Sequence, residues 1–308
     1  MLLDGIRVLD LSRLLPGGYC TQLLQHQGAE IIKLEPLSGD PIRELPGGGA
    51  FFEALHRGKQ LVRLDLRSAE GREAFLQYLP EADVLVEGFR PGVMERLSLG
   101  YKALAGVNRG LIYCAITGYG SNGTLAVRAG HDLNYLARSG ALSLMPRIDG
   151  RPAIPGLQVA DMAGGLHAAF QISAALSQRS RTGQGARLEI SMTSVMKEWT
   201  SLHRAAREAG LTAIPLTGEL PCYRVYPVAD GFLTVAALEE EFWAAFCDVL
   251  GRAELVSRQF DPTAIPELES LLRSASRAEW MARFGDRDVC VEPVLTLEES
   301  QKQAEATL

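Results

Sequence analysis

Short apolar runs alternate with helical patterns through the first half of the chain, and this alternation constrains the fold more than any other feature. Strand-like runs occupy 6–12, 30–36, 61–68, 83–89 and 110–120, and helical patterns lie between them, for example at 18–29 and 68–82. Strands that alternate with helices build a parallel sheet whose faces the helices cover. The sequence therefore predicts an α/β fold, which binds ligands at the carboxyl ends of its strands.

A different pattern follows in the second half. One long apolar helix is expected over 159–178, and a second helix over 195–209. Within 223–238, two strand-like runs flank an Ala-Asp-Gly turn, which indicates a hairpin. Prolines punctuate the loop between these parts. We therefore place a domain boundary there, with a large α/β domain over 1–215 and a smaller α+β domain over 216–308.

The N-terminal strand–helix–strand unit imitates a nicotinamide-binding unit, because its second strand ends in Glu35. Such a unit needs a GxGxxG turn, which lets the backbone approach a pyrophosphate. Here the turn reads LLPGG, where only Gly17 and Gly18 are adjacent. We do not expect a dinucleotide site.

Charge and cysteine usage narrow the partners further. The net charge of −6 disfavours nucleic acid and anionic membranes as partners. We expect no secretion signal, because no uninterrupted apolar run precedes a small-residue cleavage site. We expect no membrane span, because no apolar stretch is long enough to cross a bilayer. The five cysteines are dispersed and lack CxxC spacing, which indicates reduced thiols in a cytoplasmic protein and no metal site.

Seven segments in order resemble the family III CoA-transferase superfamily (CaiB/BaiF-like), and within it the α-methylacyl-CoA racemases. The segments span 14–36, 56–68, 83–101, 111–123, 130–140, 159–192 and 216–243. The resemblance implies an interlocked homodimer, each subunit having a Rossmann-like large domain and a small domain. It also implies that the C-terminal segment with which relatives return to the large domain is absent here.

His131, in GHDLNYLARSG, is the most discriminating residue. By its surroundings alone it also fits a capping or surface position, because histidine often serves structure. The resemblance implies that it is one of two proton-transfer residues, since transferases usually lack histidine there. It further implies that Asp132 and Tyr135 line the same pocket.

Asp161 lies just before Gly164 and Gly165, where the long helix is expected to begin. An aspartate there also fits the helix N-cap. The resemblance implies proton exchange by Asp161 in racemases and a covalent acyl anhydride in transferases. Free N–H groups at the helix start would suit a developing enolate, and the two glycines would let substrate approach.

The remaining site residues also come from the resemblance. Glu239 is implied to support His131 through a hydrogen bond, although the acidic run at 239–241 also fits a solvated helix start. Arg57, Lys59 and Arg90 are implied to contact the phosphates of coenzyme A.

Together these residues predict a racemase or epimerase of 2-methylacyl-CoA thioesters. Proton removal beside a thioester gives a planar enolate, and proton return to the other face inverts the centre, so one acid–base group must face each side. No separate cofactor is expected, because coenzyme A enters as part of the acyl-CoA substrate. The alternatives are a CoA-transferase that uses an Asp161 anhydride, and a non-catalytic CoA-binding relative.

Overall fold

The computed structural model describes residues 1–211 and 216–307, which divide into two compact units, Met1–Leu202 and His203–Leu308. The domain boundary expected after residue 215 falls at residues outside those described, so it stays a prediction. Each unit is built around its own apolar core.

A six-stranded parallel sheet in the order β3-β2-β1-β4-β5-β8 forms the centre of the first unit. Its strands are β1 (Arg7–Leu11), β2 (Glu30–Glu35), β3 (Gln60–Arg63), β4 (Val84–Glu87), β5 (Ile112–Thr117) and β8 (Ala186–Ser191). The first five lie at the apolar runs that the sequence pattern marks as strands. The predicted α/β class is confirmed.

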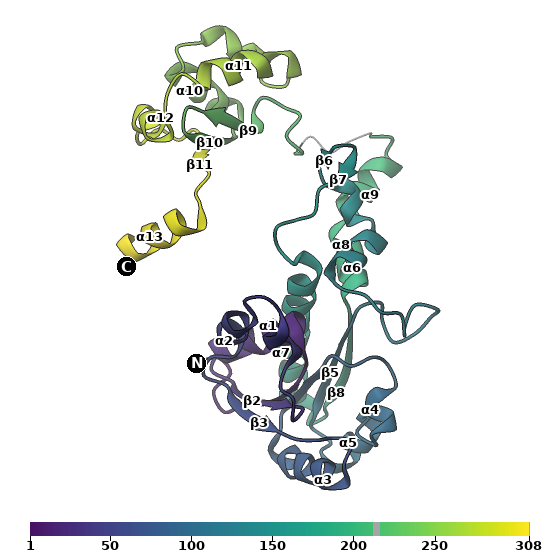
Figure 1. Cartoon of the computed structure of the whole chain (residues 1–308). Helices are drawn as coiled ribbons and strands as arrows, with labels where there is room; N and C mark the ends of the chain where they lie inside the picture. Colours follow the sequence, from purple (N-terminus) through teal and green to yellow (C-terminus); the bar gives the residue numbers. More distant parts are fainter. Residues whose placement is uncertain (212–215, 308) are drawn as a thin grey trace. The chain divides into compact units, whose positions relative to one another are not determined.

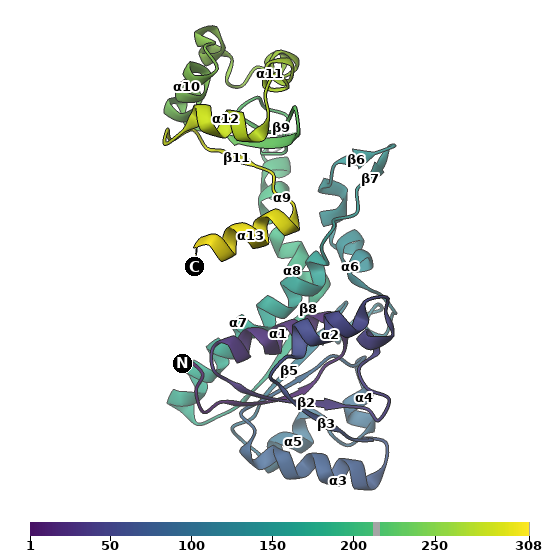
Figure 2. The same ribbon diagram turned by 60° about the vertical axis from the view of Figure 1, so that its left-hand side comes forward.

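Helices cover both faces of this sheet (Figures 1 and 2). One side carries α1 (Leu14–His26) and α7 (Val159–Thr182), and the other carries α3 (Ala69–Tyr78) and α5 (Tyr101–Val107). The remaining elements of this unit are α2 (Gly48–His56), α4 (Val93–Arg96), α6 (Asp132–Ser139), α8 (Met192–Trp199), the 3-10 turn η1 (Pro41–Glu44) and the ribbon β6 (Arg147–Ile148) and β7 (Arg151–Pro152).

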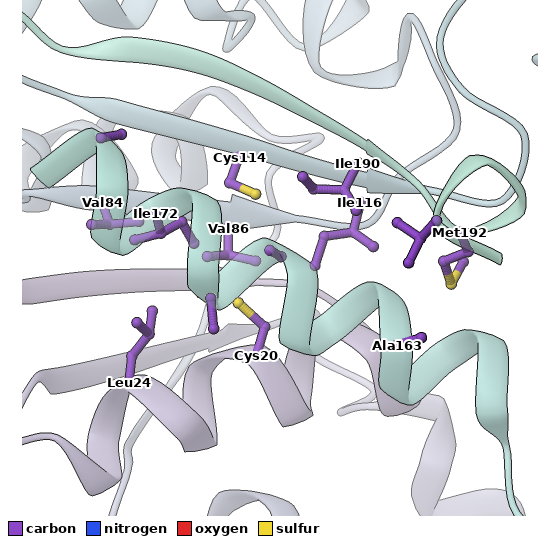
Figure 3. Packing of buried hydrophobic residues seen from close by; sticks show 14 of the residues in the cluster. Cys20, Leu24, Val84, Val86, Cys114, Ile116, Ala163, Ile172, Ile190 and Met192 are labelled. Carbon is purple, nitrogen blue, oxygen red and sulfur yellow. The ribbon is translucent and has the colours of Figure 1, made fainter. Parts of the chain in front are cut away.

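Alternate side chains of one strand serve the two cores. Val84 and Val86 of β4 join the cluster under α1 and α7, whereas Leu85 joins the cluster under α3 and α5. Figure 3 shows the first cluster, with Cys20 of α1 and Ile172 of α7 packed beside these valines. Burial on both faces explains why β4 reads Val-Leu-Val rather than alternating apolar and polar residues.

α1 and α7 pack closely because Gly165 of α7 has no side chain. A Cβ there would lie 2.5 Å from the carbonyl oxygen of Pro16. We expect Gly165→Ala to lower the free energy of unfolding by about 1–3 kcal/mol, as overpacking does. The matched control is Gly106→Ala in α5, where a Cβ meets nothing within 4 Å, and which should stabilise by about 0.5–1 kcal/mol. Urea unfolding measures both, and equal changes would contradict the packing argument.

The helix expected over 195–209 is two helices, α8 and α9 (Ser201–Glu208), separated at Thr200. The Thr200 hydroxyl donates to the carbonyl oxygen of Lys197 at 2.8 Å, and the Thr200 N–H donates to the same carbonyl. A threonine that bonds locally to the backbone competes with helix continuation. α7 extends one turn beyond the predicted residue 178 and ends at Gly183.

The second unit contains the predicted hairpin. β9 (Tyr223–Val228) and β10 (Gly231–Ala236) pair antiparallel across Ala229 and Asp230, and β11 (Val291–Pro293) extends the sheet. Around it lie α10 (Glu240–Val249), α11 (Ile265–Leu272) and α12 (Arg277–Phe284). α13 (Leu297–Thr307) follows β11 and extends away from the sheet, and its Glu299 pairs with Arg277 of α12 (Figures 1 and 2). Among the described residues, no helix has the length and apolarity needed to cross a bilayer.

Candidate active site

A cavity of about 1020 Å³ lies at the carboxyl edge of the parallel sheet in the first unit. Residues that follow β1, β2, β3, β4 and β5 form its walls, and they include Arg13, Pro36, Asp65, Arg90 and Tyr119. β1 and β4 are neighbours although β2 and β3 intervene in sequence, so the strand order reverses here. Parallel α/β sheets bind their ligands at such a switch point.

His131 lines this cavity and is the N-cap residue of α6. Its backbone N–H donates to the side-chain oxygen of Asn134 at 3.0 Å. Its imidazole ring belongs to an exposed residue at the cavity wall. His131 is therefore both a helix-capping residue and a cavity residue, although the sequence presents these two interpretations as alternatives.

Tyr135 fixes the backbone just before His131. Its hydroxyl donates to the carbonyl oxygen of Gly130, and its ring meets that of Tyr119 edge-on at 5.2 Å. A Cβ on Gly118 or Gly130 would lie less than 3 Å from the Tyr135 ring. Tyr135 also lines the cavity, as the resemblance implies.

Asp161 lines the same cavity from the first turn of α7. It is not the N-cap, since Gln158 has that position, so the capping interpretation is wrong. Burial, and secondly the charge of Asp132, raise the pKa of Asp161 to about 7. A carboxyl with that pKa is able to give or take a proton near neutral pH.

Asp132 connects the two residues. It follows His131 in the chain, and its Oδ1 accepts hydrogen bonds from the N–H groups of Ala160 at 2.7 Å and Asp161 at 3.0 Å. It therefore caps α7 rather than lining the cavity. Since Asp132 uses these N–H groups, they are not free to stabilise an enolate, contrary to the expectation for the start of this helix.

Two substitutions, Asp132→Asn and Asp132→Ala, should distinguish the effect of the Asp132 charge from the effect of its capping hydrogen bonds. The amide oxygen of asparagine still accepts from both N–H groups, so we expect the fold to persist while the pKa of Asp161 falls. Alanine should lower the free energy of unfolding by about 0.5–2 kcal/mol, as loss of a cap does. Carboxyl NMR titration and urea unfolding check the two effects. An unchanged Asp161 titration in Asp132→Asn would count against the charge effect.

Gly164 and Gly165 lie outside the cavity lining, contrary to the expectation that they admit substrate to the helix backbone. A Cβ on Gly164 would meet the side chain of Met192 at 2.6 Å, and Gly165 packs on α1. Both glycines are buried. Glycine is required here by helix packing.

Of the residues implied to bind coenzyme A, Arg90 lines the cavity. Arg57 is exposed and pairs with Glu53 at 3.0 Å. Lys59 is buried, and its ammonium group donates to the Gly18 carbonyl oxygen at 3.0 Å and to Thr21 Oγ1 at 2.8 Å. This position favours a structural role for Lys59 over a phosphate contact.

Four further arginines line the cavity and do not stand out in the sequence. They are Arg13, Arg67, Arg96 and Arg128. No described residue is hydrogen-bonded to the guanidinium group of Arg67, Arg96 or Arg128, so these groups are available to a polyanion. The signal that could have found Arg13 and Arg67 is their position a few residues after a strand's carboxyl end.

Glu239 belongs to the second unit, where it is exposed and is the N-cap residue of α10. Within residues 216–307, its side chain accepts no capping hydrogen bond from that helix. Its support of His131 stays a prediction. Among the described residues, no cluster of histidine, cysteine, aspartate and glutamate has the arrangement of a metal site.

Comparison with known proteins places the chain in a family. The family model described as CoA-transferase family III matches residues 3–307. Alpha-methylacyl-CoA racemase of Mus musculus is 36% identical, over 97% of this chain and 79% of its own. Succinyl-CoA:mesaconate CoA-transferase of Haloarcula hispanica is 34% identical, over 91% and 75%.

A solved structure agrees with this placement. The crystal structure of a CaiB/BaiF family protein from Brucella suis aligns with a TM-score of 0.86 and 28% identity, over 99% of this chain and 87% of its own. The family match over nearly the whole length and the shared fold lead to one conclusion. The chain is a member of CoA-transferase family III.

Proposed function

We propose that this protein is a racemase or epimerase of 2-methylacyl-CoA thioesters. The observation that carries the proposal is that His131 and Asp161 line one cavity and are joined through Asp132. The similarity to the mouse racemase supports the same chemistry.

In the proposed reaction the proton on the carbon beside the thioester leaves to one of the two residues. The electron pair of the broken C–H bond moves into the enolate, which is planar. The other residue then delivers its proton to the opposite face, and the configuration inverts. The raised pKa of Asp161 lets its carboxyl act as acid or as base near neutral pH, and histidine is the side chain that enzymes use most often for proton transfer.

The nucleotide part of the substrate is assigned to the arginines of the cavity. Arg67, Arg90 and Arg96 follow β3 and β4 and line the wall on that side. Guanidinium groups bind phosphate oxygens through paired hydrogen bonds, so they suit the phosphates of coenzyme A. No separate cofactor takes part in these steps, because the thioester itself stabilises the carbanion.

Label exchange in D₂O tests the proposal. Incubation with one epimer of a 2-methylacyl-CoA should incorporate deuterium at the α-carbon and yield the other epimer, without any acceptor acid. The second candidate, favoured by the similarity to the Haloarcula hispanica transferase, is CoA transfer through Asp161. Transfer that needs an acceptor acid, with no inversion in its absence, would replace the racemase proposal.

We also propose that two copies form an interlocked homodimer in the cytoplasm. Large apolar side chains are exposed on the first unit, with Leu166 50%, Phe170 67% and Trp199 55% accessible. A subunit interface would cover such side chains. All five cysteines are free thiols, which suits a reducing compartment. Light scattering on the purified protein tests the dimer.

A further inference from the structure

A network of buried charged side chains lies behind the wall that α1 contributes to the cavity. Its members are Asp10, Lys33, Asp40, His56 and Lys59, and each is at most 7% exposed. Two lysines face two aspartates, while burial, and then the two lysines, lower the pKa of His56 to about 3. The network is therefore balanced in charge when both lysines are protonated.

Lys33 holds the turn that connects β1 to α1. Its ammonium group donates to the carbonyl oxygen of Ser12 and lies 3.1 Å from Oδ2 of Asp40. The other oxygen of Asp40 accepts from the N–H groups of Leu14 at 3.2 Å and Ile42 at 3.0 Å. One lysine thus fixes both ends of the turn Ser12–Leu14, directly and through Asp40.

That turn has a strained backbone. Leu14 adopts φ 59°, the left-handed region that a leucine rarely enters. Such a residue costs about 1–3 kcal/mol and persists only where its surroundings hold it. The Lys33–Asp40 pair provides this constraint, and the side chains of Arg13 and Leu14 line the cavity.

The turn also sets the wall next to Asp161. α1 begins at Leu14, and its Pro16 carbonyl and Tyr19 ring contact Gly165. Gly165 lies about one helical turn after Asp161 in α7. A displacement of the turn would therefore open the boundary between α1 and α7 beside Asp161.

Stability alone does not account for this pair. A buried ion pair is often no more stabilising than an apolar pair of similar volume, because both charges must leave water. We propose that Lys33 is a positioning residue for the proton-transfer site, which holds the Ser12–Leu14 turn so that the α1 wall closes one side of the half-buried Asp161 to water. This inference rests on the proposed function for its catalytic consequence, but its structural part does not.

The test removes both charges of the pair at once, in Lys33→Met/Asp40→Asn, so that no unpaired charge remains. The control is Arg179→Met/Asp83→Asn, which removes an ion pair of 2.7 Å at the amino end of β4, away from the cavity. Carboxyl NMR follows the Asp161 titration without substrate. Racemisation of a 2-methylacyl-CoA gives kcat and KM.

In the Lys33→Met/Asp40→Asn variant we expect the Asp161 titration to move from about pH 7 toward acid by about one unit or more, since water then reaches more of the carboxyl. We expect kcat to fall about 10-fold or more, because small misplacements at a reacting centre are costly. KM should stay within about 3-fold, because Arg67, Arg90 and Arg96, to which the nucleotide is assigned, lie outside the displaced turn. The control should lower the unfolding midpoint but leave titration and kcat as in the wild type.

An unchanged Asp161 titration in a folded double variant overturns the inference, and so does an equal shift in the control. A wild-type protein without racemisation overturns the proposed function, while the titration still decides the positioning role. If the double variant does not fold, Asp40→Asn alone takes its place, because its amide oxygen still accepts from Leu14 and Ile42. It should shift the titration in the same direction, and no shift overturns the inference.

Discussion

Asp161→Asn is expected to reduce racemisation by about 10²–10⁴-fold, the usual contribution of a general acid–base group. Asparagine keeps the size of the side chain but exchanges no proton. For the one epimer whose α-proton faces His131, this proton should still exchange with solvent at a reduced rate. The configuration of that epimer should be retained, because His131 returns a proton to the same face. Chiral analysis and deuterium incorporation, measured for each epimer separately, distinguish inversion from exchange.

The same variant has a stability signature that does not depend on turnover. The pKa of Asp161 is raised from 3.8 to about 7, so between these pH values the folded protein holds a proton that the unfolded chain releases. The free energy of unfolding contributed by this group therefore falls as pH rises from about 4 to 7. Asparagine does not titrate, so the free energy of unfolding of Asp161→Asn lacks this decrease. The free energy of unfolding of the variant minus that of the wild type should therefore be larger at pH 8 than at pH 4. A difference independent of pH would contradict the raised pKa.

His131→Ala should also reduce racemisation by about 10²–10⁴-fold. Here exchange with retention should survive for the opposite epimer, the one whose α-proton faces Asp161. Added imidazole should restore part of the inversion, because the cavity then has room for it. The matched control is His167→Ala, since His167 lies in α7, bonds to Gln171 at 2.8 Å and does not line the cavity.

The two variants together test whether the groups face opposite sides of the carbon. If Asp161→Asn still exchanges the α-proton of one epimer and His131→Ala that of the other, the arrangement is supported. If both variants still exchange the α-proton of the same epimer, it is contradicted. Acceptor-dependent CoA transfer that is lost in Asp161→Asn but unaffected in His131→Ala would favour the transferase. If His167→Ala loses racemisation and CoA transfer as strongly as Asp161→Asn and His131→Ala do, the substitutions act through the fold and not through proton transfer.

Local patterns were sufficient for most of the architecture. The runs that became β1, β2, β4 and β5 are apolar on both sides of each strand, because both sheet faces are covered, and the Ala-Asp-Gly turn predicted the hairpin. The break at Thr200 was missed, since a threonine inside an apolar periodic pattern does not reveal whether its hydroxyl bonds to the backbone.

The sequence by itself determined the alternation of strands and helices and the family motifs that mark His131 and Asp161. Only the tertiary structure decided the neighbours of these residues. It made Asp132 the cap of α7, turned Lys59 inward and packed Gly165 against α1. The reason is physical: periodicity reports which face of one element is buried, whereas a hydrogen-bond partner some 30 to 40 positions away is chosen by how elements pack.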